Sequence, residues 1–330
     1  MNPRDGCASM PSSGGGRYDR IVRMIEESEK LKSGVESHAS NLADRLVPYS
    51  LGATGLIWLV TRNVTKALAV LMVDFSCALK LSMPIAVLSA MKEASAYHLT
   101  VKGGRFLEAV SQADTFMFDK TGTLTYAAPR VASVIPFNGE QEKFNTLPDE
   151  YSHLFLGVGG VLSAVICVKD PLREEAGEII EGLHRLGIPK LVMMTGDSER
   201  TARSVAQTTG IDEYYSEVLP EDKANYIRRE HEAGRKVIML GDGVNDSPAL
   251  SEADAGIAIR DGAAIAREVA DITIGANDLY SLLTLKRVSD ALMRRIHSNY
   301  RRIICFNLLL ICLGVAGILP PATSALLHNA

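Results

Sequence analysis

The segment MFDKTGTLT, residues 117–125, decides the fold class of this chain. Its apolar start, within the run TFMFD, is typical of a short buried strand, and Asp119 ends that strand. A glycine-containing turn with three threonines follows. A carboxylate placed there can act as a nucleophile on a phosphoryl group, while backbone N–H groups and hydroxyls hold the phosphate oxygens. We therefore expect Asp119 to be a phosphate acceptor at the carboxyl end of a strand.

Outward from this segment, strand-like and helix-like stretches alternate between residues 105 and 280. Patterned helical stretches at 174–186, 199–209 and 221–232 separate short apolar runs, which predicts the α/β class, with a doubly wound domain around a parallel sheet. The runs are TFMFD (115–119), KLVMMTGD (190–197), KVIMLGD (236–242), AGIAI (255–259) and ITIG (272–275). Three of them end in an aspartate, namely Asp119, Asp197 and Asp242. Such sheets bind their ligands at the carboxyl ends of the strands, so we expect a phosphate and magnesium site there.

Other residues extend this predicted site. The TGD segment, residues 195–197, lies at a helix start, where backbone N–H groups bind anions. Lys223 supplies a positive point charge against phosphate. The Gly-rich turn GDGVNDSPAL carries Asp242 and Asp246, whose hard oxygen ligands suit Mg²⁺. The alternative, that these residues only cap helices and form turns, is reasonable for any one of them but not for all together.

The position two residues after Asp119 separates two reaction classes. A phosphatase of this architecture would carry an acid/base carboxylate there, to protonate the leaving group and activate water. This chain has Thr121 instead. We expect an aspartyl-phosphate, once formed, to hydrolyse slowly, which suits a phosphoenzyme that is a working intermediate.

Composition excludes several other classes. The net charge of −4 gives no basic signature, so we expect no nucleic-acid partner. The five cysteines form no CxxC pair, which argues against a disulfide framework or a structural zinc site and favours a reducing compartment.

Uncharged stretches predict three membrane spans. The first is 46–61, the second is 67–91, broken only by Asp74 and Lys80, and the third begins at Ile303 and ends at Pro320-Pro321. Cations crowd the flanks that face the central part of the chain, so the positive-inside rule places that part in the cytoplasm. The predicted organisation is a flexible lead at 1–16, a cytoplasmic helix at 17–45, a membrane hairpin at 46–91, a cytoplasmic domain at 92–302 and a membrane segment at 303–330.

In this order, behind a membrane hairpin, DKTGTLT, TGD and GDGVNDSPAL resemble the phosphorylation domain of P-type ATPases. The segment SMPIAVLSAMKEASAYHLTVKGGRFLEAVSQAD that leads into them is similar to the heavy-metal-transporting, or P1B, branch, and the resemblance runs from about Arg17 onward. It implies a haloacid-dehalogenase-like phosphorylation domain, ATP as substrate and Mg²⁺ as cofactor. By this resemblance Asp119 is phosphorylated, and Thr121 and Asp242 complete the Mg²⁺ site. The same motifs give catalytic or positioning roles to Lys120, Thr195, Gly196, Asp197, Lys223, Asn245 and Asp246.

The resemblance also implies an ion path through the second span. The Cys-Pro-Cys signature of the branch falls on residues 75–77, which read Phe-Ser-Cys, so only the last cysteine is present. Cys77 would be a soft ligand, Asp74 a hard one, and Asn307 in the third span a further polar contact. This mixed set favours a divalent ion such as Zn²⁺, Cd²⁺ or Co²⁺ over Cu⁺. The alternatives are an inert Cys77 thiol and an ion pair between Asp74 and Lys80.

Several features of that branch are not found in the sequence. Only a shortened insert at about 127–165 follows the phosphorylation motif, and it includes a predicted β-hairpin around Gly157–Gly160. No histidine precedes a proline, as in the adenine site of the branch, no Thr-Gly-Glu actuator motif occurs, and one more membrane helix would be expected at the end. We therefore expect a truncated or internally deleted transporter in the plasma membrane, with its catalytic domain in the cytoplasm.

Three functions are consistent with these observations. The first is ATP-driven transport of a divalent heavy-metal cation across the lipid bilayer through an aspartyl-phosphate. The second is a membrane-tethered phosphatase of the same superfamily, against which Thr121 argues. The third is an inactive or regulatory fragment that associates with a full-length pump, or with a separate chain that supplies the missing domains.

Overall fold

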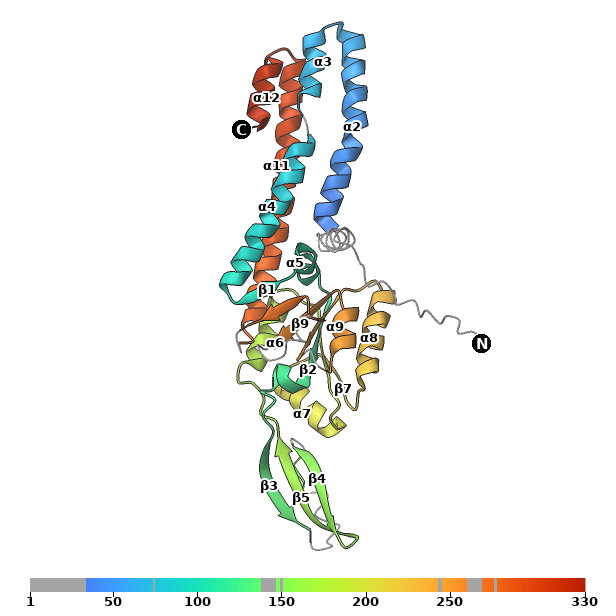
Figure 1. Cartoon of the computed structure of the whole chain (residues 1–330), viewed down its shortest axis with the longest axis vertical. Coiled ribbons are helices and arrows are strands. Elements are labelled where there is room, and N and C mark those ends of the chain that lie inside the picture. The colour runs from blue at the N-terminus through green and yellow to red at the C-terminus, as the bar shows by residue number, and fades with distance from the viewer. Residues whose placement is uncertain are drawn as a thin grey trace, which may run out of the picture.

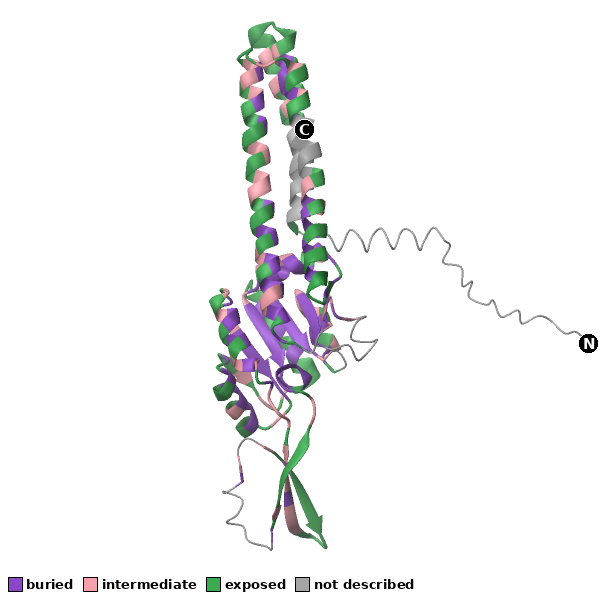
Figure 2. Ribbon diagram, turned by 90° about the vertical axis from the view of Figure 1, so that its left-hand side faces the viewer, coloured by how far each residue is buried: buried purple, intermediate pink, exposed green. Residues whose placement is uncertain are grey.

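The computed structural model describes residues 34–73, 75–137, 147–148, 151–242, 245–259, 269–275 and 278–329. Figure 1 shows three parts along the long axis: a stalk of helices, an α/β domain in the middle, and a small three-stranded sheet at the other end. Figure 2 shows that burial is concentrated in the α/β domain, whereas the helices above it and the small sheet below it are largely exposed.

The α/β domain is built on a seven-stranded sheet with the order β1-β10-β9-β8-β2-β6-β7. All neighbouring strands pair in parallel except β1, which is antiparallel to β10. The strands are β1 (Leu99–Val101), β2 (Thr115–Asp119), β6 (Lys190–Met194), β7 (Glu213–Tyr215), β8 (Val237–Gly241), β9 (Ala255–Ile259) and β10 (Ile272–Ile274). The doubly wound sheet predicted from the sequence is confirmed.

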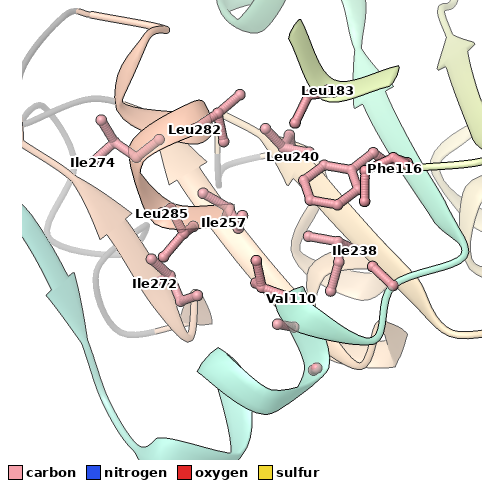
Figure 3. Close-up of a cluster of buried hydrophobic side chains, with 14 of the residues drawn as sticks. Val110, Phe116, Leu183, Ile238, Leu240, Ile257, Ile272, Ile274, Leu282 and Leu285 are labelled. Atoms are coloured by element: carbon pink, nitrogen blue, oxygen red, sulfur yellow. The ribbon is translucent and has the colours of Figure 1, made fainter. Parts of the chain in front are cut away.

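Both faces of this sheet are covered, which explains why its strands are almost continuously apolar. Phe116 of β2 lies in a large cluster with Leu183, Ile238 and Leu285 (Figure 3), whereas Met117 belongs to a second, separate cluster. The helices of the domain are α5 (Gly104–Ser111), α6 (Ala176–Arg185), α7 (Glu199–Thr209), α8 (Pro220–Glu232) and α9 (Ser247–Glu252). The predicted helices at 174–186, 199–209 and 221–232 are therefore confirmed.

The small sheet leaves the domain after β2 and returns before α6. Its strands are β3 (Arg130–Pro136), β4 (Ser152–Val158) and β5 (Val161–Lys169), in the order β3-β5-β4. β4 and β5 form the predicted hairpin, which turns through Gly159 and Gly160 at φ values of 61° and 83°. Glycine adopts such positive values at little cost, because it has no Cβ.

The stalk corrects the prediction of three continuous spans. It contains α2 (Gly34–Thr61), α3 (Val64–Leu71), α4 (Phe75–Ala96), α11 (Ser281–Val315) and α12 (Pro321–Asn329). Of the helices in the described part, α11 alone is long and apolar enough to cross a membrane, and the apolar part of α2, Val47–Thr61, is shorter. The continuous helix predicted at 67–91 is wrong, because the chain leaves the helix at Met72 and Val73. The preceding helix, α3, begins at Val64, before the predicted start at residue 67. The side chain of Asn63 caps it by accepting the N–H groups of Thr65 and Lys66.

The lower part of α4 packs against the α/β domain. Met83, Val87 and Ala90 belong to the same hydrophobic cluster as the sheet. Gly104 of α5 lies so close that a Cβ there would be 2.6 Å from Val87 Cγ1. Part of the predicted second span is therefore core of the α/β domain.

α11 joins the domain to the stalk as one helix. It begins at Ser281, crosses the predicted boundary at 302–303 without a break, and ends at Val315, earlier than the predicted end at Pro320-Pro321. Its buried Lys286 Nζ donates to the carbonyl of Ser111 at 2.8 Å and to Asp290 Oδ1 at 2.7 Å. The bond to Ser111 fastens the base of α11 to α5, whereas the bond to Asp290 lies within α11.

Candidate active site

Three loops that carry the predicted site residues meet at one edge of the sheet. β2 lies between β6 and β8, and all three strands are parallel. In register, Asp119 lies opposite Met194 of β6, and Phe118 lies opposite Leu240 of β8. The loop with Asp119 is therefore flanked by the TGD loop on one side and by the loop with Asp242 on the other.

Lys223 bridges two of the carboxylates. Its Nζ lies 2.5 Å from Asp119 Oδ1 and 2.6 Å from Asp246 Oδ1, and all three residues are buried. The position of Lys223 is set by the start of α8, where Pro220 begins the helix and the Asp222 carboxylate accepts the N–H of Leu219 at 3.0 Å. The structure thus brings together three of the residues predicted for the site.

Both aspartates that contact Lys223 have a pKa above that of an ordinary aspartate. Burial, followed by the charge of Asp246, raises the pKa of Asp119 to about 6, although Lys223 opposes the shift. Burial also raises the pKa of Asp246. For Lys223, burial disfavours the charged amine, but Asp119 and Asp246 outweigh that effect and its pKa is raised. One ammonium therefore serves two carboxylates that repel each other.

The turn after Asp119 is shaped by a glycine. Residues Lys120–Leu124 form a wide helical turn in which Thr121 has a ψ of 123° and Gly122 a φ of 76°. The N–H of Gly122 donates to Thr125 Oγ1 at 3.1 Å, so it is held within the loop. A Cβ at Gly122 would lie 3.4 Å from the Cβ of Asp242, so the two loops approach closely here. Thr121 is exposed at this edge.

Two side-chain contacts brace this turn, and the sequence predicted neither. Lys120 forms an ion pair with Asp197 of the TGD loop. Asp170, which precedes Pro171 at the end of the small sheet, accepts a hydrogen bond from Thr125 Oγ1 at 2.5 Å and from the N–H of Ala128 at 3.1 Å. The only sequence signal for Asp170 was its place before a proline, which does not reveal a contact with a residue 45 positions earlier.

The TGD loop is held by hydrogen bonds that its backbone N–H groups donate. Thr195 is buried, its N–H donates to the carbonyl of Tyr215 at 3.0 Å, and its Oγ1 accepts the N–H of Asp197 at 3.1 Å. Gly196 is exposed between them. Because the carboxylate of Asp197 is paired with Lys120, Asp197 links two loops, and the anion site predicted at 195–197 stays a prediction.

The loop after β8 depends on Gly241. A Cβ at that position would lie 2.5 Å from Asp246 Oδ2, so only glycine leaves room for the buried carboxylate. Asp246 lies directly before α9, and Asn245 beside it is exposed. Asp242 is half-buried, and its charge is one of those that raise the pKa of Asp119.

Mg²⁺ fits this edge by charge and by donor type. The aspartates carry more negative charge than the single lysine neutralises, and their oxygens are the hard ligands that Mg²⁺ prefers. Among the described residues, no group of three His, Cys, Asp or Glu side chains is arranged to hold a metal on its own. Mg²⁺ usually takes only one or two protein carboxylates and completes its shell with water and phosphate oxygens. Asp119 and Asp242, with Thr121 nearby, would supply the protein's share.

Of the three predicted ion-path residues, the structure describes only the side chain of Asn307. Asp74 lies outside the described residues, and the side chain of Cys77 in α4 lies outside the described part as well. Asn307 is buried in α11. Their roles stay predictions.

Comparison with known proteins gives an independent line of evidence. A family profile for haloacid dehalogenase-like hydrolases matches residues 138–254. The chain is 29% identical to a zinc-exporting P-type ATPase of Mycobacterium marinum and 28% identical to a manganese-exporting P-type ATPase of Mycobacterium tuberculosis, each over 391 aligned positions. Both alignments cover 94% of this chain but 53% and 54% of the relatives, so the chain spans about half their length.

A solved structure shares the fold of this chain. The crystal structure of a zinc-transporting PIB-type ATPase in an E2.Pi state matches 97% of this chain and 66% of that protein, with a TM-score of 0.77 and 23% identity, which shows a shared fold. Fold and sequence together define a haloacid dehalogenase-like α/β domain attached to a helical stalk. More narrowly, the chain is a relative of the heavy-metal P-type ATPases, as its motifs predicted.

Proposed function

We propose that this chain takes part in ATP-driven transport of a divalent heavy-metal ion, through an aspartyl-phosphate formed at Asp119. The observation that carries this proposal is the bridge from Lys223 to Asp119 and Asp246, at the ends of neighbouring strands. In this bridge the carboxylate that we propose as the nucleophile contacts the ammonium that we propose to bind phosphate. The zinc- and manganese-exporting relatives support the choice of a metal ion as cargo.

In this mechanism the Asp119 carboxylate attacks the γ-phosphorus of ATP, the bond to the bridging oxygen breaks, and ADP leaves with that electron pair. Lys223 then balances negative charge on the transferred group. Mg²⁺, when bound, would neutralise charge between the acceptor carboxylate and the phosphate. Thr121 cannot act as a general base at neutral pH, so the acyl-phosphate persists until another group activates water.

The cargo and the setting belong to the same proposal. Cys77, Asp74 and Asn307 would contact the ion, and this thiolate and oxygen set suits Zn²⁺, Cd²⁺ or Co²⁺. The stalk would sit in the plasma membrane, with the α/β domain in the cytoplasm.

The proposal is tested by acid-stable labelling. Membranes that contain the full chain are incubated with Mg²⁺ and ATP labelled at the γ-phosphate, and the label is challenged with hydroxylamine, which cleaves acyl-phosphates. We expect a hydroxylamine-sensitive label that is lost in Asp119→Asn. Asp114→Asn is the matched control, because Asp114 lies just before the same strand and its carboxylate accepts the N–H of Lys236, away from the site.

Two results would contradict the proposal. A label of equal strength in Asp119→Asn would place the phosphate elsewhere. Steady turnover of a generic phosphomonoester, with no accumulated label, would instead indicate a phosphatase. If the label forms, a series of Zn²⁺, Cd²⁺, Co²⁺ and Cu⁺ identifies the ion that changes its level.

A further inference from the structure

A small cavity lies between α4 and α11, close to the α/β domain. It has a volume of about 230 Å³, and its walls include the small side chains Ala86, Ser89 and Ala90 of α4 and the apolar side chains Val288 and Leu292 of α11. This volume is below the ~300–1,000 Å³ of sites that enclose a whole drug-sized ligand. The cavity therefore suits a small group, such as the headgroup of a larger molecule.

Two opposite charges line this cavity without pairing. Glu93 of α4 and Arg295 of α11 are both exposed, and neither forms an ion pair within the described residues. The two helices run antiparallel, because α4 ends and α11 begins beside the large sheet (Figure 1). From Val288 to Arg295, α11 rises about 10 Å away from the sheet, and from Ala86 to Glu93, α4 descends toward it by the same amount. Glu93 therefore lies at the end of the cavity nearer the domain, and Arg295 at the other end.

The cavity lies at the level where the surface of α4 changes from apolar to charged. Leu81, Ile85 and Leu88 are 65%, 63% and 64% exposed, and the first charged side chains after them are Lys92 and Glu93. Exposed aliphatic side chains suit the hydrocarbon core of a bilayer, whereas charged side chains suit its polar edge. In the proposed membrane setting, this is the headgroup level of the cytoplasmic leaflet.

We propose that the cavity binds the headgroup of a phospholipid that ends in a primary amine, the chemistry of phosphatidylethanolamine. In the cytoplasmic leaflet the acyl chains of such a lipid point toward the stalk, the phosphate follows, and the amine is outermost. The protein presents its partners in the same order, with Leu81 and Ile85 first, then Arg295, then Glu93. Arg295 pairs with the phosphate and Glu93 with the ammonium, and both contacts are charge-assisted hydrogen bonds. Basic pockets between membrane helices on the cytoplasmic side are suited to lipid headgroups.

The pair of charges disfavours other ligands that carry a phosphate. The headgroup of phosphatidylglycerol has no cation, so it would leave Glu93 unpaired. The cation of phosphatidylcholine has three methyl groups in place of N–H donors, so it cannot donate a hydrogen bond to Glu93. Free phosphate would pair with Arg295 alone, and it would gain nothing from the apolar surface of α4.

The test titrates the full chain, purified in a mild detergent, with phosphatidylethanolamine, phosphatidylcholine or phosphatidylglycerol of identical acyl chains, and counts the bound lipids by native mass spectrometry. We expect phosphatidylethanolamine to bind at least about fivefold more tightly than the other two. Glu93→Gln should remove this preference, and Arg295→Gln should weaken the binding of phosphatidylethanolamine about fivefold or more. Lys92→Gln and Arg294→Gln are the matched controls, because each changes an exposed, charged neighbour that does not line the cavity. Both controls should change binding less than about twofold.

The proposal is overturned if the unaltered chain binds the three lipids equally or not at all, or if the controls lose as much binding as Glu93→Gln and Arg295→Gln. It is also overturned if phosphoethanolamine without acyl chains displaces the lipid at equal concentration, because the ligand would then be a soluble one. Equal melting temperatures show that the variants are folded. The proposal rests on the proposed membrane setting, which flotation of liposomes with the chain tests separately. The phosphorylation label tests the proposed function separately, so failure of either is distinguished from failure of the lipid site.

Discussion

Lys223 of α8 contacts Asp119 of β2 across 104 positions of sequence, with 2.5 Å between Nζ and Oδ1. The same ammonium holds Asp246 at 2.6 Å. One buried cation thus fixes the Asp119 carboxylate relative to the loop that follows β8. Removing it would leave two like charges facing each other without water.

Lys223→Met is therefore expected to abolish the hydroxylamine-sensitive label, by about 100-fold or more, since the site loses both its cation for phosphate and the orientation of Asp119. Lys236→Met is the control, because Lys236 is a half-buried lysine whose Nζ donates to Gln112 outside the site. Labelling of both variants under identical conditions checks the expectation. Normal labelling of Lys223→Met would show that the bridge is not needed for transfer.

The stability of the chain should depend on pH through Asp119. Its pKa is about 6 in the folded chain against 3.8 for the ordinary group, so the folded chain binds this proton more tightly than the unfolded chain. The free energy of unfolding should then fall as the pH rises from about 3.8 to about 6. Asp246 shifts in the same direction, so Asp119→Asn should flatten only part of this slope. Thermal melts followed by circular dichroism between pH 4 and 7 measure it, and an identical slope in the variant would contradict the assignment.

Gly241→Ala should be far more damaging than its size suggests. The new methyl would lie 2.5 Å from Asp246 Oδ2 and would force that carboxylate away from Lys223. We expect a loss of roughly 1–3 kcal/mol of stability from overpacking, together with loss of the label. Gly177→Ala in α6 is the control, because its methyl would meet nothing closer than 3.8 Å. Equal melting temperatures for the two variants would show that the loop after β8 yields without cost.

Asp170→Ala tests the two hydrogen bonds that brace the turn after Asp119. The change removes the acceptor for both Thr125 Oγ1 and the N–H of Ala128. We expect labelling to fall about tenfold, at a stability cost of roughly 1–3 kcal/mol for the unpaired groups. Limited proteolysis should cut faster near residues 125–130, and Asp212→Ala, which removes a similar carboxylate cap on the N–H of Leu191, should leave that cleavage unchanged.

Much of the α/β domain could be predicted from the sequence because its cues are local. The apolar strand β2 and its final Asp119 are adjacent in the sequence. Strands β6 and β8 show a similar pattern, because each is a short apolar run followed within three residues by an aspartate. The contact between Asp170 and Thr125 could not be predicted, because it exists only once the two chain segments that lead to the small sheet run side by side. The two ion pairs of Lys223 could not be predicted either, because the sequence shows its positive charge but not that Asp119 and Asp246 are its partners.

The stalk was predicted less well for a different reason. Hydropathy marks where charges stop, at Ile303, but a helix continues through charged residues as long as one of its faces is apolar. Leu285, Leu292 and Ile296 provide that face and pack on the α/β domain, so α11 begins far earlier than the apolar run. The break between α3 and α4 could not be predicted for the converse reason, because Met72 and Val73, where the chain leaves the helix, are as apolar as the helices beside them.

Because α11 is one unbroken helix, a tilt at its base moves its far end. Thirty-five residues at 1.5 Å each make a rod of about 52 Å. Its lower end is clamped to α5 by the hydrogen bond from Lys286 Nζ to the carbonyl of Ser111. A tilt of the domain by about 10° would move the far end of α11 sideways by about 9 Å, which is nearly the width of a helix.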